Sequence, residues 1–282
     1  MKIKSFQSVA SQYKAIFFDS YGVLKNYNGL IEGVENTIEE LRNQGIIIHV
    51  LTNDASRSPQ QLAEKFHKLG LTEIGADDII SSGMMAREYL RLKVKEGTVA
   101  YLGTEDSAHY IETADLHTIP LSALDFNRVD EISALVLLDD EGFDWNTDFN
   151  KAINLLRLRN IPVVIANTDH TYPISGGQVA LAIGGIGNLL ENVVKKRFIR
   201  FGKPDSQMFI FAYEHLLQKS YFSKNEILMV GDSLRTDILG GNKFGFDTAL
   251  VLTGKTLPKE AKMLIKTTGV IPDYVCESVA MG

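Results

Sequence analysis

The chain has 282 residues, 45% of them hydrophobic, so it is long enough for two domains or for one elaborated domain with a sizeable core. Its formal net charge is −6 and its lysines and arginines are scattered, which argues against nucleic acid as a partner, because a phosphate backbone attracts clustered basic side chains. No stretch approaches the roughly 18 apolar residues of a membrane span, residues 1–14 lack the apolar core of a signal peptide, and the single Cys276 cannot form an internal disulfide, so we expect a cytoplasmic protein without a membrane partner.

The first predicted element is a buried strand that ends in Asp19. Apolar residues fill positions 16–18, and Gly22 permits a sharp exit from the strand. Open α/β sheets carry their sites at the carboxyl ends of strands. Asp19 is therefore a candidate for chemistry, and the alternative from this stretch alone is a carboxylate that caps the next turn.

A parallel β-α-β unit follows. Residues 33–44 have the apolar spacing of an amphipathic helix that stops at Gly45, and residues 46–51 form a second buried strand. The strand ends in Thr52 and Asn53, and a helix over 59–69 follows. Strand, helix and strand in this order are the pattern of a parallel β-α-β unit.

The pattern restarts near residue 83, which predicts a second α/β domain. Its expected elements are helices at 84–92 and 150–159 and strands at 98–102, 134–138 and 161–166. The last strand ends in Asn167 and Asp169, in a turn that loosely resembles the one after Leu51. The glycine-rich stretch 173–187 suits either a loop near a ligand or a hinge.

Alternation of strands and helices returns from residue 198. The expected elements are helices at 207–218 and 237–244 and strands at 227–230 and 248–252. The predicted fold is α/β, with a Rossmann-like parallel-sheet core domain and a second α/β domain inserted into it. We place the core at 1–82 and 198–282 and the inserted domain at 83–197.

Four polar loops are expected to meet at one edge of the core sheet. Their chemistry-bearing residues all follow strands or begin helices, and they are Asp19, Thr52, Lys203, Asp232 and Asp237. Carboxylates, a hydroxyl, backbone N–H groups and one ammonium are what a site needs to hold a phosphate beside a divalent cation. Oxygen ligands without a cysteine pair favour Mg²⁺ over zinc.

These motifs resemble those of the haloacid dehalogenase (HAD) superfamily of hydrolases, and specifically its NagD-like group with an inserted α/β (C2-type) cap. The matching stretches occur in the family's order over nearly the whole chain, at 19–24, 51–53, 202–204 and 231–237. The resemblance implies a phosphatase that uses Mg²⁺.

The resemblance also implies a role for each matching residue. Asp19 is expected to be the nucleophile that forms an aspartyl-phosphate, with Lys203 neutralising charge beside it. Thr52 and the N–H of Asn53 are expected to hold the phosphoryl oxygens. The implied metal ligands are Asp19, the backbone carbonyl of Tyr21, Asp232 and Asp237. Two alternatives stay open: Thr52 as a helix cap, and Asp237 as the N-cap of its own helix.

Tyr21 departs from the family pattern. Phosphatases of the superfamily usually carry a second aspartate at this position as the general acid and base, and tyrosine is a weaker acid at neutral pH. Three functions remain in view. We favour a phosphohydrolase that is slow or restricted to good leaving groups. The alternatives are a metal-independent haloacid-type dehalogenase and a phosphate- and metal-binding regulatory protein with little turnover.

In the NagD-like group, the resemblance assigns substrate specificity to the inserted cap. Asn167 and Asp169 are the candidate contacts with the part of the substrate that is not phosphate, and ordinary turn chemistry is the alternative role for both. The expected partner is a small phosphorylated metabolite. The resemblance also implies a homodimer formed through the cap.

Overall fold

The computed structural model describes residues 2–175, 178–218 and 220–281, and these form two compact units. Unit 1 lies within 1–52, 59–80 and 203–282, and unit 2 lies within 53–58 and 81–202. This division departs from the boundaries expected from the sequence at three places, which are residues 53–58, 81–82 and 198–202. Residues 199–200 add an edge strand to the sheet of unit 2, and the turn 53–58 also packs with unit 2. Within the described residues, no helix has both the length and the apolar character needed to cross a bilayer.

Unit 1 is built on a six-stranded sheet in which five neighbouring strands, from β15 to β4, pair in parallel. Across the sheet the strands are β15 (Tyr274–Cys276), β14 (Asp247–Val251), β13 (Ile227–Gly231), β1 (Ala15–Phe18), β4 (Ile47–Thr52) and β5 (Ile79–Ser81). Phe18 in the central strand is in register with Val230 on one side and with Val50 on the other. The three central strands therefore end level with one another, and the residues that follow them share one edge.

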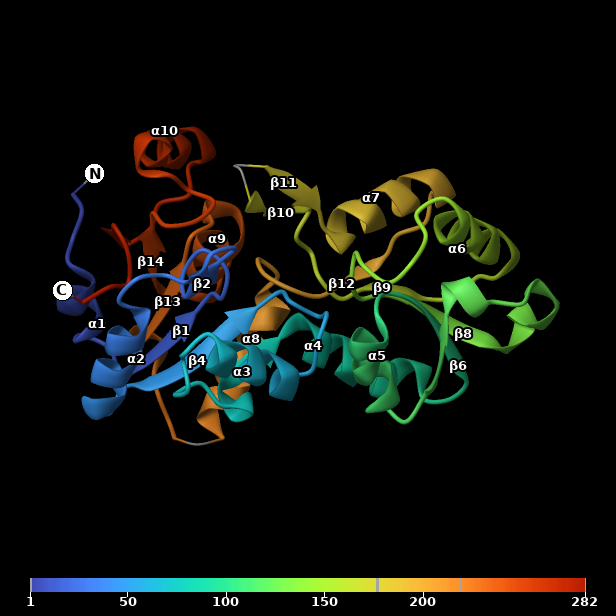
Figure 1. Ribbon diagram of the computed structural model, residues 1–282, viewed down its shortest axis with the longest axis horizontal. Helices are drawn as coiled ribbons and strands as arrows, with labels where there is room; N and C mark the ends of the chain where they lie inside the picture. Colours follow the sequence, from blue (N-terminus) through green and yellow to red (C-terminus); the bar gives the residue numbers. More distant parts are fainter. Residues whose placement is uncertain (1, 176–177, 219, 282) are drawn as a thin grey trace. The chain divides into compact units, whose positions relative to one another are not determined.

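Helices cover both faces of this sheet (Figure 1). On one face are α1 (Phe6–Ala10), α2 (Val34–Asn43) and α3 (Pro59–Lys68), and on the other are α8 (Ser206–Leu217), α9 (Leu239–Phe244) and α10 (Pro258–Thr268). Side chains alternate between the faces along β1, as the period of a strand requires. Ile16 and Phe18 join the core beneath α2, whereas Phe17 stacks on Phe246 at a centroid distance of 5.7 Å.

Short elements complete unit 1. A hairpin of β2 (Lys25–Asn26) and β3 (Gly29–Leu30) follows the turn after β1. The 3₁₀ turns are η1 (Ala76–Asp78) and η6 (Lys224–Glu226), and a π-helical turn, η7 (Leu234–Ile238), precedes α9. The expected helix at 237–244 therefore begins three residues earlier, so Asp237 lies inside a helical turn and is not an N-cap.

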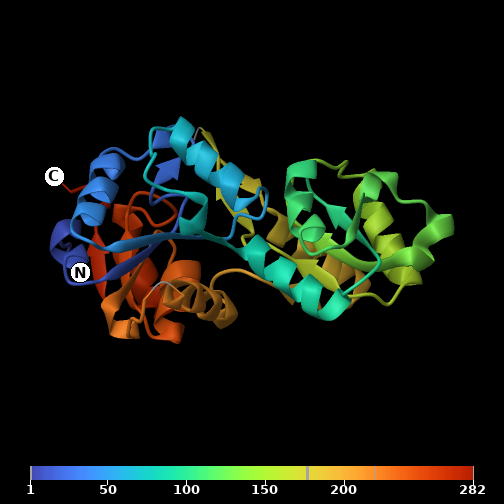
Figure 2. The same cartoon turned by 90° about the horizontal axis from the view of Figure 1, so that it is seen from below.

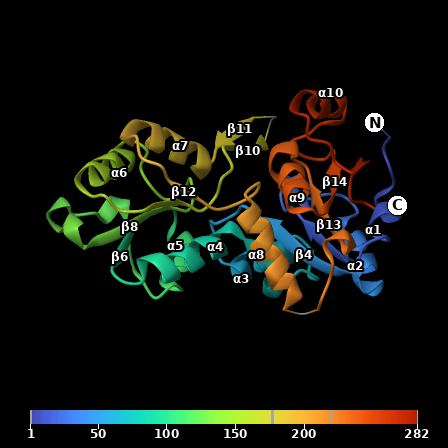
Figure 3. The same cartoon turned by 180° about the vertical axis from the view of Figure 1, so that it is seen from behind.

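Unit 2 contains a five-stranded sheet between two pairs of helices (Figure 3). Its strands, in order across the sheet, are β12 (Ile199–Arg200), β9 (Val163–Ile165), β8 (Ile132–Leu137), β6 (Thr98–Leu102) and β7 (His117–Pro120). Helices α6 (Thr147–Leu158) and α7 (Ile183–Val194) lie on one face, and α4 (Ser82–Tyr89) and α5 (Glu105–Glu112) lie on the other. A π-turn η2 (Leu90–Val94), two 3₁₀ turns η3 (Leu121–Ala123) and η4 (Phe126–Glu131), and a hairpin of β10 (Thr171–Pro173) and β11 (Val179–Leu181) complete it.

Part of the glycine-rich stretch 173–187 is regular structure. Residues 183–187 begin helix α7, and Gly176 and Gly177 lie outside the described residues. A Cβ atom at Gly187 would collide with the Ile165 side chain on β9. Glycine is used here so that the helix can approach the sheet closely, which hydrophobic spacing alone does not reveal.

Candidate active site

Asp19 stands at the end of the central strand of unit 1. Its backbone N–H continues the ladder by donating to the Val230 carbonyl at 2.8 Å, and the four residues of β1 before it are all buried. The chain then turns through Gly22, whose φ is +84°. A Cβ atom at Gly22 would overlap the Asp232 carboxylate, so glycine at this position lets two loops of the site meet.

Lys203 joins three segments of the site. Its side chain is only 2% exposed, and its ammonium donates to Asp19 Oδ1 at 2.6 Å and to the Leu51 carbonyl at 2.8 Å. It also forms an ion pair with Asp237 Oδ1 at 2.7 Å. Burial by itself lowers the pKa of Lys203, but the two carboxylates outweigh it and raise the pKa, so the amine stays charged.

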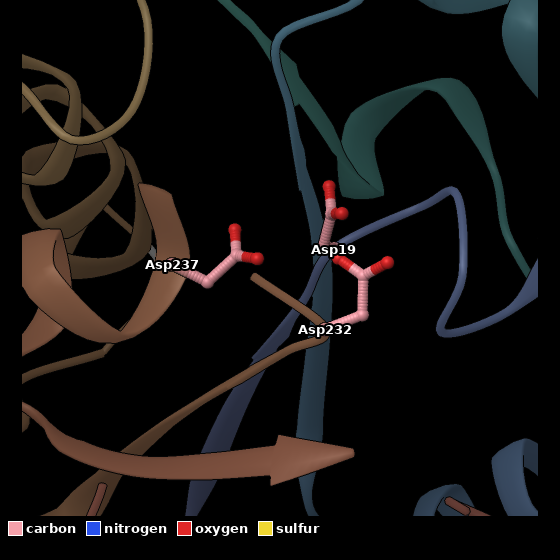
Figure 4. A group of neighbouring side chains, drawn as sticks. All are labelled: Asp19, Asp232 and Asp237. Atoms are coloured by element: carbon pink, nitrogen blue, oxygen red, sulfur yellow. The ribbon is translucent and has the colours of Figure 1, made fainter. Parts of the chain in front are cut away.

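Three carboxylates converge beside this ammonium (Figure 4). Ligand atoms of Asp19, Asp232 and Asp237 all lie within 4.8 Å of one another, and they come from the ends of β1 and β13 and from η7. Burial, followed by the charges of the other two carboxylates, raises the pKa of Asp232 well above its ordinary value. Burial likewise raises the pKa of Asp237, to about 6. The cluster therefore carries more negative charge than one ammonium balances.

A divalent cation fits this donor set. All the donors are oxygens, which Mg²⁺ prefers, and Asp232 is only 1% exposed, so the charge it carries is not screened by bulk water. The implied ligands Asp19, Asp232 and Asp237 are brought together by the fold. They form the one group of three or more such side chains with metal-ligand spacing among the described residues.

The loop after β14 also belongs to the site, and sequence reasoning missed it. The backbone N–H of Lys255 donates to Asp232 Oδ2 at 2.6 Å, and the N–H of Thr256 donates to the Asp232 carbonyl at 3.2 Å. Thr253 donates its hydroxyl hydrogen to the Gly22 carbonyl at 2.6 Å. The available signal was Gly254, two residues after the predicted strand at 248–252, in a loop that follows a strand as the other site loops do.

Thr52 and Tyr21 lie on the same edge of unit 1. Thr52 is buried at the end of β4, next to the Leu51 carbonyl that Lys203 contacts. Tyr21 is half-buried, and burial raises the pKa of its phenol above the ordinary value, while a hydrogen bond from the Tyr27 backbone acts in the opposite direction. The phenol is therefore protonated at neutral pH and is a weaker acid than a free tyrosine.

The other three predicted substrate contacts form a separate group within unit 2. The Asn53 amide donates to Thr168 Oγ1 at 3.2 Å and to Asp169 Oδ1 at 3.5 Å. Asn167 accepts the Asp169 backbone N–H at 2.8 Å, which is the turn chemistry named above as the alternative role for this residue. Asn53 thus links the turn after β4 to the turn after β9, although the two are 115 residues apart in sequence.

The chain matches two family models and many known proteins. Residues 16–117 match the model described as haloacid dehalogenase-like hydrolase, and residues 200–281 match a second HAD-hydrolase-like model. Phosphoglycolate phosphatase 2 of Arabidopsis thaliana is 30% identical over 98% of this chain and 94% of its own length. Mouse chronophin is 28% identical over the same shares.

Solved structures agree with these matches. The crystal structure of a possible sugar phosphatase of the HAD superfamily from Cytophaga hutchinsonii has a TM-score of 0.96 and 58% identity, covering 100% of this chain and 99% of that one. NagD from Escherichia coli, at 23% identity, shares the fold with a TM-score of 0.76 over 96% of this chain and 98% of its own. The chain belongs to the haloacid dehalogenase-like hydrolases, and it shares its fold with NagD.

Proposed function

We propose that this protein is a Mg²⁺-dependent phosphohydrolase that cleaves small phosphorylated metabolites through an aspartyl-phosphate on Asp19. The observation that carries the proposal is the buried ammonium of Lys203, which contacts Asp19 and Asp237 at once. A carboxylate held in this way is oriented for attack and is kept from repelling an incoming phosphate. The names of the relatives support phosphate monoesters as the substrate class: phosphoglycolate phosphatase and glycerol-3-phosphate phosphatase are among them.

The proposed reaction has two steps. An Asp19 oxygen forms a bond to phosphorus while the bond from phosphorus to the leaving oxygen breaks, and that oxygen takes up a proton. Water then attacks phosphorus, and Asp19 leaves as a carboxylate while phosphate departs. Lys203 stays in contact with the Asp19 carboxylate, and Thr52 with the N–H of Asn53 would hold phosphoryl oxygens. Throughout, the burial of the site limits competing contacts with bulk water.

Asp19, Asp232, Asp237 and the Tyr21 carbonyl are the proposed holders of Mg²⁺. When bound, the ion neutralises charge on the phosphoryl group and orients it. The closeness of the three carboxylates and their raised pKa values support this assignment. Supporting it further, a glycerol phosphate phosphatase from Mycobacterium tuberculosis, similar in fold with a TM-score of 0.79, was solved in complex with magnesium.

Tyr21 sets the proposed limit on the leaving group. A sugar or alkyl alkoxide needs a proton as it departs, and the phenol of Tyr21 is a poor source of one because its pKa is raised. Substrates with good leaving groups, such as aryl or acyl phosphates, do not need this help. We therefore expect higher turnover for aryl and acyl phosphates than for alkyl phosphates.

Asn53, Asn167 and Asp169 are the proposed contacts with the rest of the substrate. A homodimer through unit 2 is also proposed. It is supported by two exposed apolar side chains one helical turn apart on α7, Leu189 and Val193, which are 52% and 49% exposed. Light scattering of the wild type and of Leu189→Glu tests this, since loss of a dimer in the variant is expected and a monomeric wild type would contradict it.

The decisive experiment measures hydrolysis of p-nitrophenyl phosphate and acetyl phosphate with Mg²⁺ and with EDTA, together with chloride release from 2-chloropropionate. We expect phosphate release that requires Mg²⁺ and no chloride release. Phosphatase activity that persists in EDTA would contradict the proposed mechanism. Metal-independent chloride release would replace it with the dehalogenase function, and absence of turnover on every substrate would favour the regulatory function.

A further inference from the structure

A second pocket of unit 1 adjoins the loop that carries Asp19. Its volume is about 310 Å³, and it lies between the β2–β3 hairpin and helix α3, which are side by side (Figure 2). We call it the hairpin pocket. It is lined by Tyr21, Lys25, Asn26, Tyr27, Gly29, Lys65, Lys68 and Leu69.

The lining of the hairpin pocket is cationic. Three of its eight residues are lysines and none is acidic, although the whole chain carries a net charge of −6. Lys65 and Lys68 are three residues apart on α3 and so project from the same side of the helix. Lys25 comes from the hairpin, and its ammonium lies 5.3 Å from the centroid of the Phe66 ring, which helps to hold it beside α3. Three positive groups from two separate elements thus surround one concave surface.

The hairpin is tied to the nucleophile loop through its backbone. The Gly22 N–H donates to the Lys25 carbonyl at 2.7 Å, and the Lys25 N–H donates to the Ser20 carbonyl at 3.1 Å. Within the hairpin, the Asn26 side chain accepts the Asn28 N–H at 2.8 Å and fixes the turn. Tyr21, two residues after Asp19, contributes to the wall of the pocket. A ligand in the pocket would therefore rest on the loop that positions the nucleophile.

We propose that the hairpin pocket is a binding site for a small anion that carries at least two phosphate groups, distinct from the site of the transferred phosphoryl group. Lys25, Lys65 and Lys68 recognise the phosphates, since ammonium groups contributed by the hairpin and by α3 can pair with separate phosphate groups. The chemistry is shared by pyrophosphate and by a nucleoside diphosphate. The Tyr27 ring, which is 54% exposed at the rim, distinguishes them by offering a surface on which a base can stack.

Calorimetric titration with pyrophosphate and with ADP tests the proposal. It is carried out in EDTA, so that metal-bridged binding at the carboxylates does not contribute, and it needs no enzymatic turnover. Lys65→Gln/Lys68→Gln is expected to weaken the binding of both ligands at least about tenfold, because hydrogen bonds to charged groups are the stronger kind. Lys262→Gln/Lys266→Gln on α10 removes the same charge from a pocket that also contains Asp273 and is the matched control.

Each outcome decides the matter. Selective loss in the α3 variant supports the site. If Tyr27→Ala weakens the binding of ADP but not of pyrophosphate, the ligand is assigned as a nucleoside diphosphate. If the variant binds both ligands as tightly as the wild type does, the ligand is assigned as the bare diphosphate. Equal losses in the α3 and α10 variants would reduce the effect to overall charge and overturn the proposal, as would unchanged binding in the α3 variant or no binding to the wild type.

Discussion

Two acidic clusters in this protein occupy equivalent positions in their sheets but differ in their partners. In unit 1, Asp19 and Asp237 share the ammonium of Lys203. In unit 2, Asp139 and Asp140 follow β8, and the contacts described for Asp139 are the Thr104 hydroxyl at 3.4 Å and the backbone N–H of Asp140 at 2.9 Å. In both clusters an aspartate follows a parallel strand, and the members are buried or half-buried.

The difference shows in how the two clusters hold their charge. Burial first, then the charges of Asp140 and Asp54, raise the pKa of Asp139 to about 6. In unit 1 burial also raises the pKa of Asp237 to about 6, but there the charge of the Lys203 ammonium acts in the opposite direction, and three carboxylates around one ammonium leave an excess of negative charge that suits a bound cation. An acidic strand end is therefore a poor guide to a reactive site unless a buried cation accompanies it.

The largest expected effect is a loss of phosphatase activity when the cluster in unit 1 is changed but not when the cluster in unit 2 is changed. Asp19→Asn removes the nucleophile and should lower kcat at least about 10³-fold on p-nitrophenyl phosphate. Asp139→Asn also replaces an aspartate that follows a strand, and Asp139 is more buried than Asp19. This variant should keep most of the wild-type activity. Steady-state kinetics with Mg²⁺ measures both. Similar losses in the two variants would contradict the assignment of the nucleophile.

The second prediction concerns the ammonium itself. Lys203→Met leaves Asp19 and Asp237 facing each other without a counter-charge, and breaking a buried pair in this way costs about 3–5 kcal/mol of unfolding free energy. Urea denaturation in EDTA measures the loss, with the exposed Lys68→Met as control. Saturating Mg²⁺ should restore part of the stability, because it supplies positive charge to the same carboxylates. An unchanged midpoint would show that the ion pair does not stabilise the fold.

The third prediction restores the missing acid. Tyr21→Asp should raise turnover of an alkyl phosphate such as glycerol 3-phosphate by about 10²-fold, the lower end of what a positioned acid contributes. Turnover of acetyl phosphate should change much less, since its leaving group needs no proton. Tyr21→Phe is the control for loss of the ring hydroxyl. Equal effects on both substrates would mean that Tyr21 does not limit protonation.

The smallest expected effect is on stability in unit 2. A carboxyl whose pKa is raised in the folded state contributes stability below its ordinary pKa of 3.8 and loses it as the pH rises through about 6. At pH 7 Asp139 is therefore ionised, which lowers the unfolding free energy of the wild type. Asp139→Asn should be more stable than the wild type by roughly 1–2 kcal/mol. Paired urea denaturations at pH 7 and pH 4 measure this. The difference in unfolding free energy between the variant and the wild type should shrink at pH 4. A larger difference at pH 4 would show that folding lowers the pKa of Asp139 instead of raising it.

Short-range patterns in the sequence determined much of this protein. Apolar runs predicted β1, β4 and β13, and because parallel strands end at a common edge, they also predicted that Asp19, Thr52 and Asp232 would share it. Lys203 and Asp237 were expected at the same edge because they lie near the starts of predicted helices, and the family motifs added a role for each residue. Each of these inferences needs only the period of a strand and the residue that follows it.

Only the tertiary structure decided which groups contact one another. The backbone N–H of Lys255 on Asp232, the amide of Asn53 on Thr168 and the shared ammonium of Lys203 join segments that are far apart in the chain. Helix α7, with Gly187 packed against β9, and the lysine-lined hairpin pocket likewise depend on neighbouring elements. Hydrophobic periodicity reports the face that a segment buries, whereas a contact between loops depends on how the strands that carry them are ordered in the sheet.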